Sequence, residues 1–245
     1  YVVEVLNEDR EVVFSRKIII YENELNVGAT VKRTRNNSTV EAKQNLEISI
    51  DYAGGNFLNP KQNFKVTIMQ NGRFDTTISN ILPQFSIGTE FLYKYDSETQ
   101  FYGGNEFQYF DNSNIQQVNN NIVKITSDAI YNSFLYPLPP RNLKPYSFYE
   151  EINGAFLPRN KFRENASIES DYAWVYFNLP TEEYQNKDVY VGGMFNNYLL
   201  TDENKLEYDS SEKAYKKPIL LKQGFTSYLY TLVDKKTKKI DREAA

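Results

Sequence analysis

The sequence predicts an all-β protein, and three observations predict it. Apolar and polar residues alternate with a period of two along much of the chain, as in residues 46–52, where every second residue is apolar. Aromatic residues make up 15% of the chain and are almost all Tyr or Phe, which favour strands. Clusters rich in Gly, as at residues 54–56 and 103–105, separate the alternating runs. Short strands separated by such turns are typical of β-sandwiches.

Residues 1–27 are predicted to form a hairpin at the front of the chain. Alternating runs at 2–6 and 12–21 flank the polar turn 7–10. Because a lone hairpin is marginal in water, it needs a sheet to join. Either it completes the sandwich that follows, or it closes a domain lying upstream. In the second case its apolar face should be more exposed than that of residues 46–52.

Residues 28–155 are predicted to form the middle sandwich. After the strand at 46–52, a second alternating run at 64–68 reaches Asn71-Gly72 and resumes at Arg73. An Asn-Gly pair between such runs is a strong hairpin signal, because both central residues of a type I′ turn need a positive φ. Further strands of this domain are expected at 90–95, 106–110 and 122–126.

A proline-rich stretch is predicted to divide the chain. Five prolines occur between Pro137 and Pro158, and each removes a backbone donor and restricts the preceding residue. We therefore place a linker at 156–164. It is expected to be packed and rigid, because Phe148, Ile152, Phe156 and Leu157 would be costly to leave in water.

Residues 165–245 are predicted to form the C-terminal sandwich. Its expected strands lie at 172–177, 188–191, 219–221 and 227–233. The run 172–177 is aromatic at both alternating sets of positions, which favours a strand buried between two layers. The alternative is an aromatic platform on which a sugar or a base stacks.

Composition excludes several kinds of chemistry. The 245 residues include no His and no Cys. Serine and cysteine nucleophiles activated by His are therefore excluded, as are HExxH metalloproteases, disulfides and zinc knuckles. Neither GxGxxG nor GxxxxGK[ST] occurs. The carboxylate doublets 150–151 and 182–183 would point to opposite faces of a strand. We predict no catalytic residues, no cofactor and no enzymatic activity.

Neither a metal ion nor nucleic acid is expected as a ligand, and no transmembrane segment is expected. Residues 111–116 begin like a calcium loop, but Ile115 stands where an oxygen ligand belongs and Gln116 where the turn glycine belongs. A solvated turn is predicted there, and no metal site. The net charge of −4 disfavours nucleic acid. No apolar run approaches the ~20 residues of a membrane helix.

The stretch 189–198 places a strand, the corner Gly192-Gly193 and then Phe195-Asn196-Asn197-Tyr198 in succession. It resembles glycogen-binding and branching-enzyme modules of the early-set immunoglobulin-like group. The resemblance implies an immunoglobulin-like sandwich for this domain. In those modules the last aromatic residue of the loop is normally a Trp that stacks on glucose, and here it is Tyr198. Phe195, Asn196, Asn197 and Tyr198 are therefore the candidate interaction loop.

Three stretches together resemble a bacterial family. They are Gly-Asn-Glu-Phe-Gln-Tyr-Phe-Asp at 104–111, the run from Pro-Pro-Arg at 139–141 to Ile-Asn-Gly-Ala-Phe at 152–156, and residues 171–198. In order and spacing they are similar to the plug-protein family of the Bacteroidota type IX secretion system. The Arg usually found beside the Asn-Gly of the second stretch is Ala155 here.

The resemblance implies a domain organisation, a partner and a place in the cell. It implies that the front hairpin closes a preceding β domain, and that a further strand follows Asp234, so that the C-terminal sandwich lacks its last strand. It also implies a periplasmic protein at the inner face of the outer membrane, which blocks the pore of the outer-membrane translocon when no substrate is engaged.

Two functions follow from the sequence as predictions. The first is a non-enzymatic periplasmic plug or adaptor subunit built of tandem immunoglobulin-like β-sandwich domains. The alternative is a surface glycan-binding β-sandwich protein of a polysaccharide-utilisation system, based on the loop Phe195 to Tyr198 and on the 20 Tyr of the chain.

Overall fold

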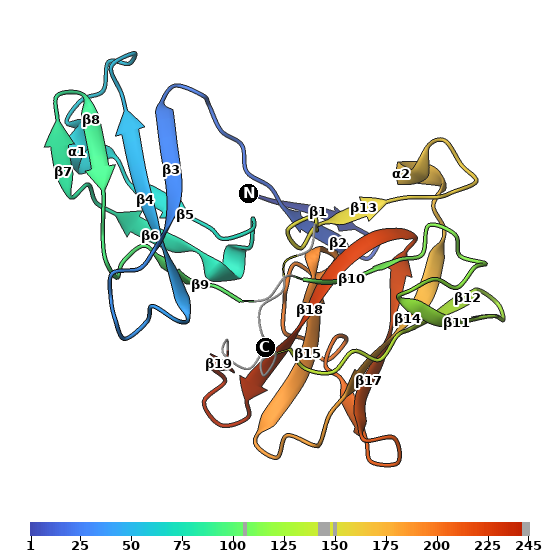
Figure 1. Cartoon of the computed structure of the whole chain (residues 1–245). Helices are drawn as coiled ribbons and strands as arrows, with labels where there is room; N and C mark the ends of the chain where they lie inside the picture. The colour runs from blue at the N-terminus through green and yellow to red at the C-terminus, as the bar shows by residue number, and fades with distance from the viewer. Residues whose placement is uncertain (105–106, 142–147, 149–150, 242–245) are drawn as a thin grey trace. The chain divides into compact units, whose positions relative to one another are not determined.

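The computed structural model describes residues 1–104, 107–141, 148 and 151–241 (Figure 1). Strands dominate these residues, and the α-helices among them are the single turns α1 (Pro60–Asn63) and α2 (Ala166–Glu169). The prediction of an all-β protein is confirmed. The chain divides into two compact units, Tyr1–Gly103 and Gly104–Ala245, which are described separately below. The immunoglobulin-like assignment stays a prediction.

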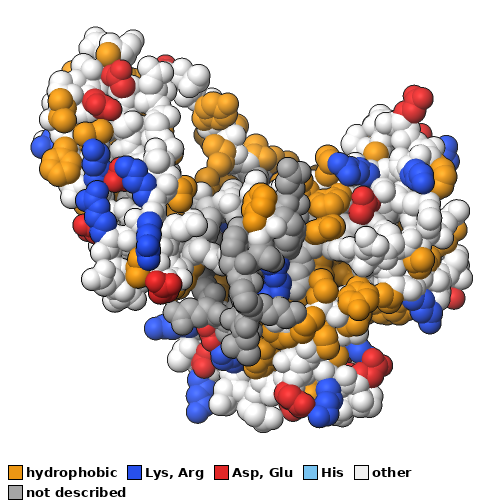
Figure 2. Space-filling model, viewed as in Figure 1, with side chains coloured by type: hydrophobic (Ala, Val, Ile, Leu, Met, Phe, Trp, Pro, Cys, Tyr) orange, Lys and Arg blue, Asp and Glu red, His pale blue; other side chains and the backbone are white. Residues whose placement is uncertain are grey.

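The N-terminal unit begins with the predicted hairpin. Strands β1 (Val2–Leu6) and β2 (Val12–Lys17) form a two-stranded sheet that no other described strand joins. Every residue of β1 is exposed, and Ile20 beyond the hairpin is 68% exposed. Figure 2 shows hydrophobic side chains at the surface along this part of the chain. The hairpin is therefore more exposed than residues 46–52, as predicted, and it does not complete the sheet that follows.

The main sheet of this unit has the order β3 (Asn26–Arg33), β4 (Lys43–Asp51), β8 (Glu90–Tyr93) and β7 (Phe85–Ile87), and β9 (Gln100–Tyr102) pairs with the other end of β4. The short strands β5 (Val66–Ile68) and β6 (Ile78–Ile81) form a second layer. The core between the two layers consists of Ile48, Ile50, Val66, Ile68, Ile81, Phe91 and Tyr93.

The predicted Asn-Gly turn lies between β5 and β6. Asn71 and Gly72 both have positive φ, 53° and 66°, and the Arg73 amide donates to the Gln70 carbonyl at 3.0 Å. The second strand begins only at Ile78, not at Arg73, because Phe74–Thr76 form a 3₁₀ turn η1. The turn is therefore confirmed, whereas the predicted start of the second strand is wrong.

Two five-stranded sheets form the C-terminal unit. One has the order β11 (Ile122–Ser127), β12 (Tyr131–Leu135), β14 (Tyr172–Pro180), β17 (Ala214–Lys222) and β16 (Glu207–Asp209), in which only β12 and β14 run parallel. The other is built around β18 (Gly224–Asp234). Its partners are β10 (Gln108–Asp111), β13 (Phe156–Pro158), β15 (Lys187–Gly193) and β19 (Ile240–Asp241).

The two sheets share one core. The first sheet contributes Val175, Phe177 and Leu179 from β14, and the second contributes Val189, Val191 and Tyr228. A short strand, β19, follows Asp234 and pairs with β18. That the C-terminal sandwich lacks its last strand stays a prediction.

The predicted boundary between residues 155 and 165 is wrong. The residues of β10, β11 and β12 fall within the predicted middle domain 28–155. In the structure, however, β10 pairs with β18, β12 pairs with β14, and β11 joins the sheet of β14 through β12. The predicted linker 156–164 begins with β13, which pairs with β18. Pro158 ends this short strand, and a missing donor is tolerated at the end of a strand. The chain divides instead between Gly103 and Gly104.

The expected packing of the proline-rich stretch is found only in part. Phe148 is 73% exposed and Leu157 is 43% exposed, against the prediction that both are buried. Ile152 and Phe156 are half-buried. Pro145 and the predicted strand residue Glu106 lie outside the described residues.

Candidate functional site: an exposed aromatic sheet face

The predicted interaction loop forms a tight corner after β15. Residues Met194–Asn196 make the 3₁₀ turn η2. The Asn196 Oδ1 accepts hydrogen bonds from the backbone amides of Gly193 (3.0 Å) and Tyr198 (3.1 Å). Its Nδ2 donates to the Val191 carbonyl at 3.2 Å. The Asn196 side chain therefore shapes the corner, and Asn197 continues it with a positive φ of 52°.

Both aromatic rings of the loop are engaged within the C-terminal unit. Phe195 packs against the core, with its ring centroid 6.2 Å from that of Phe177. The Tyr198 hydroxyl donates to the Gly154 carbonyl oxygen at 2.7 Å, and its ring meets Phe107 edge-on at 6.3 Å. The structure thus brings the four predicted residues together, but it uses Phe195 and Tyr198 to hold the fold.

This corner joins the sequence stretches that carry the family resemblance. Phe107 comes from the first stretch, Gly154 from the second and Tyr198 from the third. Gly154 has a φ of +76°, and a Cβ there would lie 2.4 Å from the Tyr198 hydroxyl oxygen and 2.6 Å from the Phe107 ring. Residues from all three stretches therefore contact one another at this corner.

The aromatic strand β14 presents different residues on its two sides. Its inward residues Ala173, Val175 and Phe177 are buried in the core. On the outward side, Tyr172 is 54% exposed and Trp174 is 38% exposed. The interpretation of this strand as buried on both faces is therefore wrong, because the sheet turns one aromatic face to solvent.

Neighbouring strands extend the exposed aromatic row. Phe134 of β12 lies opposite Tyr176, and the two rings stack with centroids 4.2 Å apart. Leu220 of β17 lies opposite Trp174 and is 44% exposed. These five outward side chains, Phe134, Tyr172, Trp174, Tyr176 and Leu220, are called the aromatic face below.

Two lysines flank the aromatic face. The Lys124 Nζ lies 5.2 Å from the Phe134 ring centroid, and the Lys222 Nζ lies 5.9 Å from that of Tyr172. Such ammonium groups are attracted by the negative faces of the rings. The Lys222 Nζ also donates to the Ser167 carbonyl at 2.9 Å, which fixes its position. The aromatic face is therefore flanked by the ammonium groups of Lys124 and Lys222.

A polar groove lies in the same unit beside β10. It encloses about 450 Å³ and is lined by Tyr109, Asp111, Ser113, Asn114, Gln117, Val118, Asn119, Asn120, Asn121, Lys161 and Phe225. Tyr109 and Phe225 stack at 5.1 Å along one wall. The Nδ2 groups of Asn119 and Asn121 donate to the Asp111 and Tyr109 carbonyls. These two amides therefore cover the outer edge of β10, and the cavity is called the amide groove below.

The residues resembling a calcium loop form a hydrogen-bonded turn in this groove wall. The Asp111 and Asn114 side chains accept from the amides two residues on. Asn112, predicted in a solvated turn, is instead fully buried, and its Oδ1 accepts from the Gly224 amide at 2.8 Å. Among the described residues no group of three acidic side chains could hold a metal ion. The described residues, taken together, also contain no helix that is long and apolar enough to cross a membrane.

The sequence offered an aromatic platform at residues 172–177 only as the alternative to a buried strand, although part of the signal for an exposed face was visible. Tyr172, Trp174 and Tyr176 occupy alternate positions, which places them on one side of a strand. What the sequence did not indicate is the parallel pairing of β12 with β14, which adds Phe134, and the absence of core packing on that side.

Comparisons with known proteins support the fold, and they indicate no function for this protein. No family model and no curated protein matches the chain. The structure is similar to the crystal structure of a hypothetical protein from Parabacteroides merdae ATCC 43184 at 2.30 Å resolution, with a TM-score of 0.87 and 24% sequence identity. The match covers 98% of this chain and 62% of that one, so the chain spans less than two thirds of its neighbour. At this identity the likeness shows the fold alone.

Proposed function

We propose that the protein is a non-enzymatic periplasmic plug or adaptor subunit that associates with the outer-membrane translocon of the type IX secretion system and occludes its pore. Three collinear sequence stretches support the family assignment, and they meet at Phe107, Gly154 and Tyr198. The structural neighbour from Parabacteroides merdae, whose function its name leaves open, comes from the Bacteroidota, the phylum of the plug-protein family.

The adaptor function is supported chiefly by the exposed aromatic face. Tyr, Trp and Phe are enriched at the centres of protein interfaces, because each buries a large area with few rotatable bonds. Trp174 lies beside Tyr176 and Tyr172 on one strand, with Leu220 opposite. A side chain of this size contributes about 1.5–3 kcal/mol when fully buried. A few such anchors suffice for a specific contact, and the flanking Lys124 and Lys222 favour a partner rim that carries carboxylates.

Copurification tests the proposal. The full-length native protein is expressed at its normal level, and a tagged translocon is isolated in detergent at low salt. We expect the protein to be recovered with the translocon in a fixed ratio. Recovery equal to that from an untagged strain would contradict the proposal.

Glycan binding is the second candidate function, and the amide groove favours it. Amide and hydroxyl groups beside aromatic rings suit the hydroxyls and apolar faces of neutral sugars. Gln117 and Asn120 line the groove and are exposed. Affinity electrophoresis on a panel of soluble glucans tests it, with a Gln117→Ala/Asn120→Ala variant as comparison. Retardation that the double variant loses would support glycan binding, and unchanged mobility on every glucan would remove it.

A further inference from the structure

Strand β3 leaves one long edge of the N-terminal main sheet open. It has eight residues, all exposed, and pairs with β4 in an unbroken register from Asn26 opposite Asp51 to Arg33 opposite Gln44. Among the described residues, no strand pairs with its other edge. Alternate N–H and C=O groups along that edge therefore point away from the sheet.

An open edge of this kind can pair with another chain and lead to aggregation, so proteins usually protect it. Protection takes the form of short strands, bulges, prolines or inward-pointing charges, because an open edge is a template for a further strand. The register of β3 against β4 shows no bulge. Residues 26–31 contain neither a proline nor a charged side chain. The first six residues of β3 therefore lack all of these protections.

An uncovered apolar strip accompanies the open edge. Val27 lies opposite Ile50, and Val31 lies opposite Leu46, so the two valines point to the core side of the sheet. Ile50 is only 6% exposed, whereas Val27 and Val31 are each 63% exposed. The layer formed by β5 and β6 thus covers β4 but not β3. One added strand would cover the edge, and its apolar side chains would pack beside Val27 and Val31 on the same face of the sheet.

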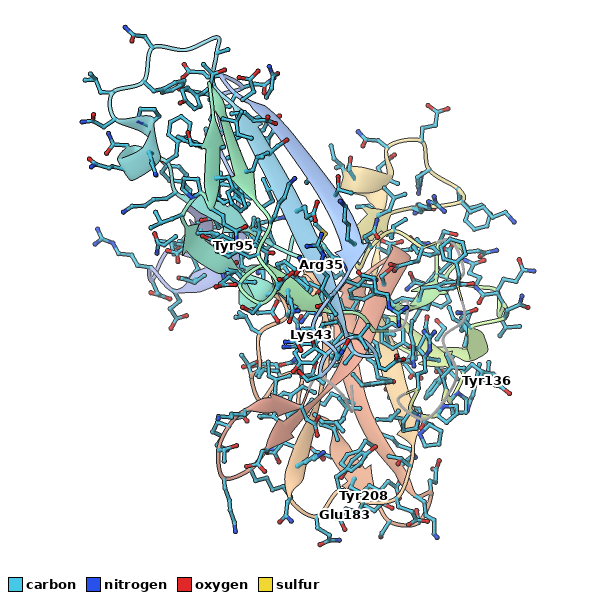
Figure 3. All side chains as sticks on the ribbon, turned by 60° about the vertical axis from the view of Figure 1, so that its left-hand side comes forward. Arg35, Lys43, Tyr95, Tyr136, Glu183 and Tyr208 are labelled. Atoms are coloured by element: carbon cyan, nitrogen blue, oxygen red, sulfur yellow. The ribbon has the colours of Figure 1, made fainter. Side chains whose placement is uncertain are left out.

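The C-terminal end of β3 is basic. Lys32, Arg33, Arg35 and Lys43 lie at this end of the β3–β4 pair, where Figure 3 labels Arg35 and Lys43. Glu47 holds Lys32 at 2.6 Å, and its other oxygen lies 3.8 Å from Arg35. Arg33 meets Glu41 only at 3.7 Å, with both side chains more than three-quarters exposed. Four cations against two carboxylates leave a net charge of +2.

We propose that the β3 edge receives an extended segment of a partner protein as an additional antiparallel strand. Backbone pairing supplies the contact, in the mode known as β-augmentation. The antiparallel direction is the slightly more stable one. It places the N-terminal end of the segment at Arg33 and Lys32, where acidic residues complement the charge. Alternate apolar residues then lie beside Val31, Ala29 and Val27. This interaction uses the N-terminal unit and is independent of the aromatic face.

A designed peptide tests the proposal with the purified chain alone. The acetylated, amidated peptide Glu-Glu-Val-Thr-Val-Thr-Val-Thr places its acids opposite Arg33 and Lys32 and its valines opposite Val31, Ala29 and Val27. Binding is followed by amide chemical shifts in ¹⁵N-labelled protein. We expect saturable shifts centred on residues 26–33. A peptide with Lys-Lys in place of Glu-Glu should bind at least about tenfold more weakly, a difference of about 1.4 kcal/mol.

Matched variants locate the contact. Val27→Lys/Val31→Lys places charges at the edge and should weaken peptide binding at least about tenfold. Val13→Lys introduces the same charge at a valine of similar exposure in β2 and should leave binding unchanged. Circular dichroism confirms that each variant is folded.

Three results would overturn the proposal. They are shifts that do not saturate or that centre elsewhere, equal binding of the two peptides, and self-association of the unliganded chain that the double variant abolishes. The last result would assign the edge to a second copy of the chain. None of them bears on translocon binding.

Discussion

The Tyr198 hydroxyl donates a 2.7 Å hydrogen bond to the carbonyl oxygen of Gly154, 44 residues earlier in the chain. Gly154 follows Asn153 in a turn where both residues have positive φ, and the Ala155 amide closes the turn onto the Ile152 carbonyl. The turn leads directly into β13, which pairs with β18. This single bond therefore ties the corner after β15 to the entry of another strand in the same sheet.

Removing either partner should destabilise the C-terminal unit. Tyr198→Phe loses one partly buried hydrogen bond, and we expect a cost of about 0.5–1.5 kcal/mol in the free energy of unfolding. Gly154→Ala should cost about 1–3 kcal/mol, because a Cβ overlaps Tyr198 and φ is positive. Urea denaturation measures both variants. The double variant should be less destabilised than the sum, since Tyr198→Phe removes the overlapping oxygen. Strict additivity would show that the two residues are not coupled.

Gly224 should be even less tolerant of a side chain. Its φ is +155°, and a Cβ would lie 2.3 Å from the Leu157 carbonyl oxygen, a backbone atom that cannot move without breaking the pairing of β13. We expect Gly224→Ala to lower stability by roughly 3 kcal/mol or more. Gly54→Ala is the matched control, because nothing lies within 4 Å of its added carbon and its φ is not positive. A loss below 1 kcal/mol for Gly224→Ala would contradict the close approach described here.

The strands with clear alternation could be predicted from the sequence, and those without it could not. β4 and β18 could be predicted because their inward residues are apolar at every second position. β12 was missed because Asn132 faces outward and Ser133 inward, so that polarity does not alternate along it. The domain boundary was wrong for a different reason. Prolines mark a break in pairing, but they do not tell whether the strands on either side belong to one sheet or to two.

Local pattern does not reveal what the rings of the candidate loop contact, and the role of this loop in an interaction stays a prediction. The loop Phe195 to Tyr198 has the sequence of a binding loop. In the structure, however, the Tyr198 hydroxyl donates to the Gly154 carbonyl and the Phe195 ring packs near Phe177. Trp174 has a core-like sequence context, yet no described residue buries its outer side. Both outcomes depend on tertiary contacts, such as that of Tyr198 with Gly154, 44 residues earlier in the chain.

Asp209 should stabilise the protein in a pH-dependent manner. The Ser211 hydroxyl, Lys216 and the Glu212 amide donate hydrogen bonds to its carboxylate, which lowers its pKa below the ordinary value of 3.8. A lowered folded-state pKa gives stability that is fully present above the unfolded pKa and is lost as pH falls through the folded value. Asp209→Asn should therefore lower the urea midpoint at pH 7. The difference from wild type should shrink below about pH 4. A difference independent of pH would rule out this role.

The front hairpin should open far more readily than the cores. β1 and β2 pair only with each other among the described strands, and all residues of β1 are exposed. A two-stranded sheet without a second layer has little to oppose local unfolding. Hydrogen exchange followed by mass spectrometry should give peptides from residues 2–17 much lower protection than peptides from β4 or β14. Equal protection would mean that another surface covers the hairpin in solution.

The most direct test of the central claim is translocon binding by variants of the aromatic face. Trp174→Ala and Tyr176→Ala remove its central side chains, and Leu199→Ala is the control, because Leu199 is 48% exposed and lies after the corner of β15. We predict that each aromatic variant lowers recovery with the tagged translocon at least about tenfold, as expected for interface hot spots, while circular dichroism shows that it remains folded. Leu199→Ala should be recovered like wild type. Full recovery of the Trp174→Ala/Tyr176→Ala double variant would contradict the assignment of the aromatic face as the docking surface.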